Sequence, residues 1–134
     1  MRRSGNNKEN TVTTNAEIVD DYYTKSRLDR ENMYSQMIES YQKIIDKTNA
    51  SETQKQSAQK EITKINEQKN AIMIAENLLK NKNFSDLIIF INDKSINIVV
   101  KTKKLQTEQV AQIQNIITRE FSANISNIHI STKE

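Results

Sequence analysis

The chain has 134 residues, of which 35% are hydrophobic and 28% are charged, and its net charge is +3. This length fits one domain with a modest core, and the absence of cysteine excludes disulfides, thiolate zinc sites and a cysteine nucleophile. Proline is also absent and the single glycine is Gly5, so we expect long uninterrupted helices and no glycine-rich phosphate loop.

The first 16 residues are polar and have almost nothing to bury, so we expect them to be a disordered lead-in or linker. They lack the apolar stretch of a signal peptide. The longest purely apolar run covers residues 87–91, far short of the ~20 residues that a membrane-spanning helix needs. We therefore expect residues 17–134 to form one soluble domain.

Residues 17–48 are predicted to form a helix. Apolar residues recur there at spacings of three and four, which places them on one stripe: Tyr34, Met37, Ile38, Tyr41, Ile44 and Ile45. A weaker stripe begins at Ile18, and the polar segment RLDRE, residues 27–31, separates the two. This stripe predicts packing against a second helix.

The second predicted helix covers residues 52–82. Ser51 and Gln54 have the spacing of a capping box at its start. Its first half has one apolar stripe, whereas its second half has two: Ile72, Ala75 and Leu79 on one side, and Ala71, Ile74 and Leu78 on the other. A helix that is apolar on two sides is usually covered on two sides, so we expect the second half to lie between the first helix and another layer.

The rest of the chain predicts two strands, a helix and a last strand. Residues 87–91 and 96–100 are rich in β-branched residues and flank a polar loop at 92–95, which predicts a hairpin. Thr107 is the expected cap of a helix that stops at Asn124, with Val110, Ile113, Ile117 and Phe121 on its apolar face. After Ile125, the alternation around Ile128 and Ile130 predicts the last strand.

These elements give an α+β fold with the order α-α-β-β-α-β. From the second helix onward the order is αββαβ, which predicts a three-stranded sheet with two helices on one face, preceded by a long N-terminal helix. Such a sheet has exposed edges, and exposed edges invite pairing with another chain.

Four segments carry a resemblance to a known family. They are YYTKSRLDRENMYSQMIESYQKII (22–45), NASETQKQSAQKEITKINEQKNAIMIAENLLK (49–80), NFSDLIIFINDKSINIVVK (83–101) and TEQVAQIQNIITREF (107–121). In length and order they resemble the stage III sporulation protein AH family, and in particular its clostridial members. The resemblance covers roughly residues 20–134.

The resemblance implies a ring-building motif, shared with inner-ring proteins of flagella and injectisomes. It also implies a transmembrane helix in the mother-cell (outer forespore) membrane, which this sequence lacks, and a domain in the space between mother cell and forespore. The implied partners are the extracellular domain of stage II sporulation protein Q and other proteins of the stage III A operon. The implied assembly, with self-association into a ring as a further possibility, is a channel that bridges the two membranes.

Three exposed positions in the predicted fold are candidate partner-binding sites. The first is the RLDRE segment, where the apolar stripe lapses; the second is a lysine cluster after the second strand; the third is the polar face of the last strand. The candidate residues are Arg27, Asp29, Arg30, Glu31, Lys101, Lys103, Asn127 and His129. His129 alternates with Ile128 and Ile130, so we expect a surface histidine rather than a base or a ligand.

The sequence predicts no catalytic residue, no metal site and no cofactor, because it has no nucleophile with a base, no ligand cluster and no phosphate loop. Asp20 and Asp21 are adjacent, and adjacent residues on a helix do not face each other. The order αββαβ also resembles a KH-like nucleic-acid-binding domain, which is the alternative function. KH domains clamp the backbone with a GXXG loop, and no glycine follows Gly5.

Overall fold

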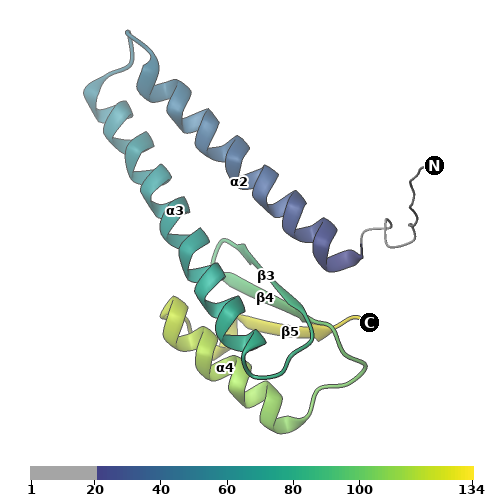
Figure 1. Cartoon of the computed structure of the whole chain (residues 1–134). Coiled ribbons are helices and arrows are strands. Elements are labelled where there is room, and N and C mark those ends of the chain that lie inside the picture. Colours follow the sequence, from purple (N-terminus) through teal and green to yellow (C-terminus); the bar gives the residue numbers. More distant parts are fainter. Residues whose placement is uncertain (1–20) are drawn as a thin grey trace, which may run out of the picture.

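The structure is a computed structural model that describes residues 21–134 (Figure 1). Its elements in chain order are α2 (Tyr22–Asp46), α3 (Glu52–Lys80), β3 (Leu87–Asn92), β4 (Ser95–Val100), α4 (Thr107–Phe121), the 3-10 turn η1 (Ile125–Asn127) and β5 (Ile128–Thr132). The predicted α-α-β-β-α-β order is therefore confirmed. The predictions for residues 1–16 and for the stripe at Ile18 lie outside the described residues.

The three strands form one sheet in the order β3-β4-β5. β3 and β4 are antiparallel, with Ile89 opposite Ile98, whereas β4 and β5 are parallel, with Ile98 opposite Ile130. A hairpin joins the antiparallel pair, and the crossover through α4 returns the chain in the same direction, as a parallel pair requires. β3 and β5 are thus the two edge strands of the described sheet.

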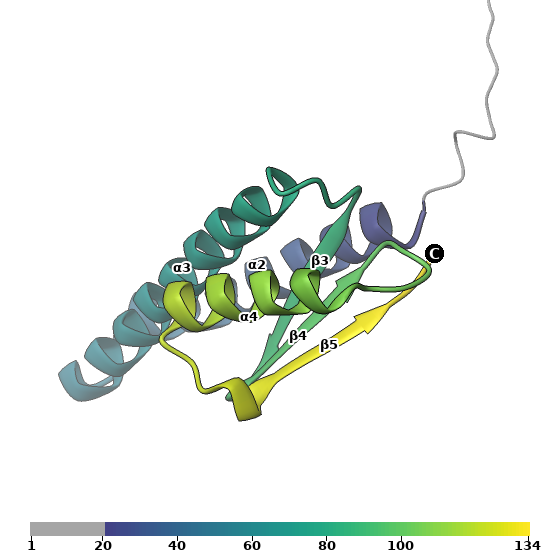
Figure 2. The same ribbon diagram turned by 90° about the horizontal axis from the view of Figure 1, so that it is seen from below.

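The helices cover the two faces of this sheet unequally. α3 and α4 pack on one face, as predicted, over a core that includes Leu79, Ile89, Ile98 and Ile113, each fully buried. The first half of α2 lies on the side of the sheet away from α4 (Figures 1 and 2). Ile88 is fully buried although its side chain points away from the face of Ile89. The opposite face is therefore covered over β3 and open over β5.

The two long helices pack as an antiparallel hairpin, whose far end extends beyond the sheet in Figure 1. Tyr34 and Ile65 are buried between α2, α3 and the sheet. Two core predictions are wrong: Met37 is 38% exposed and so is Ile74. Each lies at the flank of a stripe that is wider than the helix–helix contact it serves, so only the central residues of the stripe are covered.

Element ends differ from the predictions where backbone groups found other partners. Asp21 caps α2, because its carboxylate accepts the Thr24 N–H at 2.7 Å, and Ser51 and Gln54 form the predicted capping box of α3. At α4 the cap is Gln106 rather than Thr107, since the Gln106 N–H donates to the Gln109 side chain at 2.9 Å.

Two turns are also tighter than the sequence indicates. Asn92 still pairs with Ser95, so the hairpin loop has two residues, not four, and Asp93 takes a positive φ of 59°. α4 ends at Phe121, before the predicted stop at Asn124, because Ser122 adopts the left-handed conformation. Aspartate is one of the residue types that adopt the left-handed conformation most readily, so Asp93 is an unsurprising turn residue. Serine has no such preference, so the sequence does not indicate that the helix ends at Ser122.

Candidate functional site

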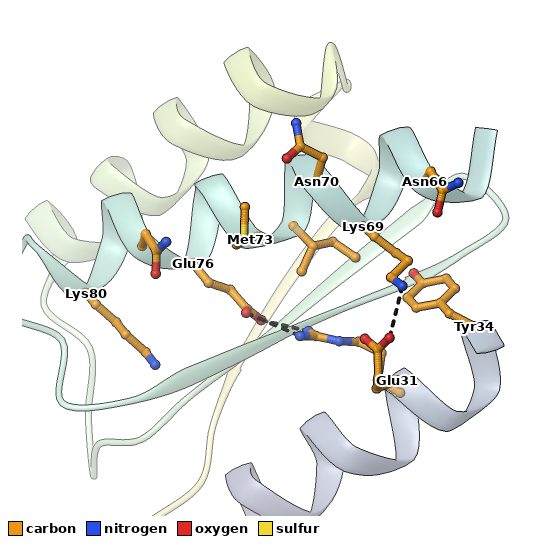
Figure 3. Close-up of a pocket in the computed structure, with 11 residues that line it drawn as sticks. Glu31, Tyr34, Asn66, Lys69, Asn70, Met73, Glu76 and Lys80 are labelled. Carbon is orange, nitrogen blue, oxygen red and sulfur yellow. Dashed lines mark hydrogen bonds and ion pairs between the residues drawn. The ribbon is translucent and has the colours of Figure 1, made fainter. Parts of the chain in front are cut away.

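Arg30 of the RLDRE segment points into the fold. Its guanidinium Nη1 lies 2.7 Å from the Glu76 Oε2 and also donates to the carbonyl oxygen of Ile89 at 2.7 Å. The Arg30 and Glu76 side chains are only 13% and 10% exposed. Figure 3 shows Glu76 on α3 reaching toward α2, with a dashed line for this ion pair. One cation and one anion from two helices therefore meet over strand β3.

The same ion pair occupies the free edge of β3. The Asp86 carbonyl accepts the Lys101 N–H at 2.9 Å, so, by the alternation of a strand, Leu87 and Ile89 direct their backbone groups away from β4. The Ile89 N–H donates to Glu76 Oε2 at 2.9 Å, and the Ile89 carbonyl accepts from Arg30. Both edge-facing backbone groups of Ile89 are thus hydrogen-bonded to side chains.

Arg27 makes a second contact of this kind one turn earlier on α2. Its guanidinium donates to both Asp86 carboxylate oxygens, at 3.0 and 3.3 Å. The Asp86 Oδ1 also accepts the edge-facing N–H of Leu87 at 2.8 Å, and Lys80 lies 3.5 Å away. Burial raises the pKa of the Asp86 carboxyl, but the hydrogen bonds from Arg27 and Leu87 outweigh burial and leave the pKa below its ordinary value.

Asp29 and Glu31, the acidic members of the segment, lie on the outside. Asp29 pairs with Lys25 at 3.2 Å and Glu31 pairs with Lys69 at 2.9 Å, and both carboxylates are more than half exposed. Between α2 and α3 lies a groove of ≈ 440 Å³ whose lining includes Arg30, Glu31, Lys69 and Glu76 (Figure 3). The charged side chains named here are already paired with each other across the groove. These ion pairs therefore hold α2 against α3.

The opposite edge of the sheet, on β5, is arranged differently. Lys133 donates its N–H to the Val100 carbonyl at 3.0 Å. By alternation, the backbone groups of Ile128, Ile130 and Thr132 then point away from β4. Among the described residues, the Ile128 N–H donates to the Ile125 carbonyl, and no hydrogen bond is made by the N–H groups of Ile130 and Thr132. In the described part of the chain, β5 is therefore an edge with unpaired donors and acceptors.

The other four predicted site residues surround β5. His129 is exposed and pairs with Asn97 on the face away from α4, as expected for a surface histidine. Asn127 comes directly before the strand, in a groove of ≈ 350 Å³ shared with Phe121. Lys101 and Lys103 follow β4 at the other end, where Lys101 lies 3.8 Å from Asp21. These residues form a rim around the open edge.

Glu76 and Asp86 are the site residues that the sequence reasoning missed. Glu76 directly follows the buried Ala75 and is itself 7% exposed. A lone acidic residue between the buried Ala75 and Leu79 was the available signal, because buried acids are nearly always paired. Among residues 21–134, no group of three or more histidine, aspartate or glutamate side chains could hold a metal ion, and no helix is long and apolar enough to cross a membrane.

Comparisons with known proteins point to one family. The family model described as SpoIIIAH-like protein matches residues 2–130. Stage III sporulation protein AH of Bacillus subtilis (strain 168) is 27% identical over 114 residues, which cover 85% of this chain and 51% of that protein. The chain therefore spans about half the length of this curated relative.

A solved structure shares the fold. A chain in the structure of the SpoIIQ–SpoIIIAH pore forming complex aligns with a TM-score of 0.76 and 23% sequence identity. The alignment covers 85% of this chain and 98% of that chain. Almost all of the other chain is thus matched by the present fold.

Proposed function

Because this chain belongs to the SpoIIIAH-like protein family, we propose that it is an assembly module that binds the extracellular domain of stage II sporulation protein Q. The related chain comes from a complex between SpoIIQ and SpoIIIAH that is described as pore forming. The present chain would act in the same way, as one half of a bridge between the mother-cell membrane and the forespore.

The observation that carries this proposal is the match of family and fold together. The family match extends over residues 2–130, and the fold match includes the helical hairpin as well as the sheet. A module of this kind needs surfaces rather than reacting groups. The described residues offer surfaces: an open sheet edge on β5, and a rim that includes exposed Lys103 and His129.

We propose that the partner contacts the rim of β5. Lys101, Lys103, Asn127 and His129 are the predicted site residues that lie there. Asp29 and Glu31 would form a second contact on the outer side of α2. Arg27 and Arg30 would hold α2 in place rather than contact the partner, because their guanidinium groups are bound within the fold by Asp86 and Glu76.

The proposed location is the space between mother cell and forespore, with attachment to the mother-cell membrane. We further propose that the chain is not an enzyme and needs no cofactor, since its relatives belong to a sporulation complex. The KH-like alternative has no supporting observation in the fold, and family membership argues against it.

The test is co-elution of this domain with the SpoIIQ extracellular domain on a sizing column. We expect a one-to-one complex at low micromolar concentration. An unrelated extracellular domain of similar size serves as the control and should elute separately. Two separate peaks at high micromolar concentrations of both partners would contradict the proposal.

A further inference from the structure

We propose that the sheet of this domain accepts an added strand at β5 alone, because Arg30 and Glu76 close the edge of β3. We further propose that the strand added at β5 is an extended segment of a partner protein that carries acidic side chains at one end. The identity of that partner rests on the proposed function; the closed and open edges do not.

The closure of β3 follows from the hydrogen bonds of Leu87 and Ile89, two of its three edge-facing residues; the third is Ile91. An incoming strand would need the Ile89 N–H and carbonyl, and these already bond to Glu76 at 2.9 Å and to Arg30 at 2.7 Å. The next edge-facing donor, Leu87 N–H, is bonded to Asp86 at 2.8 Å. Native sheets protect their edges with covering elements and inward-pointing charges, and both devices are present here, since α2 and α3 contact β3.

β5 has neither device among the described residues. α4 is the only helix in residues 21–134 that packs closely along β5, and it covers a face of the sheet rather than the edge. Thr132 is exposed and Ile130 is half-buried. The Ile128 N–H is bonded to the Ile125 carbonyl, so an extended segment would find free donors at Ile130 and Thr132, in the geometry of β-augmentation.

A sheet with one open edge restricts how copies of this chain can join. Continuing the sheet from copy to copy needs an open edge on each side, as in any head-to-tail arrangement. With β3 closed, two copies could pair only β5 to β5, which ends at a dimer. A ring of these domains would therefore have to use other surfaces, and β5 stays available to a different protein.

Charge at the end of β5 indicates the chemistry of that protein's segment. Four lysines flank the end of the sheet where β4 and β5 finish: Lys101, Lys103, Lys104 and Lys133. An antiparallel β5–β5 pair would set this end against the start of the other strand, beside the β3–β4 turn, where Asp93 and Lys94 balance each other, so a second copy would bring no net negative charge to the lysines. A segment with acidic side chains opposite the lysines is complementary.

Amide hydrogen exchange on the intact chain tests both edges without any substitution. In the isolated protein we expect the Ile89 amide to exchange on the order of 100-fold more slowly than the Ile130 and Thr132 amides, because only Ile89 is bonded at its edge. Adding the SpoIIQ extracellular domain should slow exchange at Ile130 and Thr132. Exchange at Ile89 as fast as at an unbonded Ile130 in the isolated chain would overturn the closed edge.

The remaining outcomes separate this proposal from the proposed function. Slow exchange at Ile130 in the isolated chain would overturn the open edge: concentration-dependent slowing would mean a second copy, and concentration-independent slowing a segment of the chain itself. A complex that forms on the column but leaves Ile130 fast would overturn strand addition by the partner. If no complex forms, the proposed function fails, and the comparison of Ile89 with Ile130 still decides which edge is closed.

Discussion

Tyr23, in the first turn of α2, donates its phenol hydroxyl to the backbone carbonyl of Lys133 at 2.5 Å. The Tyr23 side chain is 1% exposed, and its ring meets that of Tyr22 edge to face at 5.1 Å. This bond joins the first described helix to the residue that follows the last strand. It ties the added N-terminal helix to the sheet at the end where the lysines gather.

Replacing Tyr23 by phenylalanine should lower the free energy of unfolding by about 1 kcal/mol, because the ring stays buried and only the hydrogen bond is lost. Urea denaturation followed by circular dichroism measures the change. Tyr22→Phe is the matched control: no hydrogen bond of its hydroxyl is found among the described residues, so its stability should equal that of the parent. Equal stability of Tyr23→Phe and Tyr22→Phe would show that the bond contributes nothing.

Glu76→Ala should destabilise the fold by roughly 3–5 kcal/mol, because it leaves the buried Arg30 guanidinium and the Ile89 N–H without their partner. Lys69→Met is the comparison, since it breaks an ion pair of similar length, 2.9 Å, whose Glu31 side chain is 57% exposed. Exposed pairs contribute about 0–1 kcal/mol. Thermal unfolding of the two variants side by side checks the prediction, which fails if the two losses are alike.

Acid should weaken the fold partly through Asp86. Its carboxyl has a pKa lowered in the folded state, so its contribution to stability is complete above the ordinary aspartate pKa of about 3.9. The contribution is lost as the pH falls through the folded value. In Asp86→Asn, the unfolding free energy should therefore be lower at neutral pH and fall less steeply below about pH 4. Denaturant titrations across this range measure the slope, and an unchanged slope would contradict the assignment.

The sequence predicted the order of elements well because each element depends on a local pattern. The stripe through Tyr34 and the alternation of Ile96, Ile98 and Val100 are periodicities that a single face of a helix or strand imposes. The capping box at Ser51 is equally local. The residues of each pattern lie close together in the sequence, so the pattern can be found without knowledge of the tertiary fold.

The role of the RLDRE segment could not be predicted in the same way. Arg30 acts through Glu76 and Ile89, which are 46 and 59 residues away in the sequence. From sequence alone a charged segment is predicted to be exposed, and only the tertiary fold shows that it covers a strand edge. For the same reason the sequence could place His129 on the polar face of a strand, but it could not say which of the two edge strands would be left open.

The lysine end of β5 should control how fast the partner binds. Lys103→Glu reverses an exposed charge beside the open edge, so it should lower the association rate with the SpoIIQ extracellular domain about tenfold at low salt, while added salt should reduce the difference. Lys60→Glu is the matched control, because Lys60 is also exposed but lies on the half of α3 that extends away from the sheet. Surface plasmon resonance at two ionic strengths gives both rates. If the two reversals slow association equally, the effect comes from net charge rather than from this end of the sheet, and the partner must approach elsewhere.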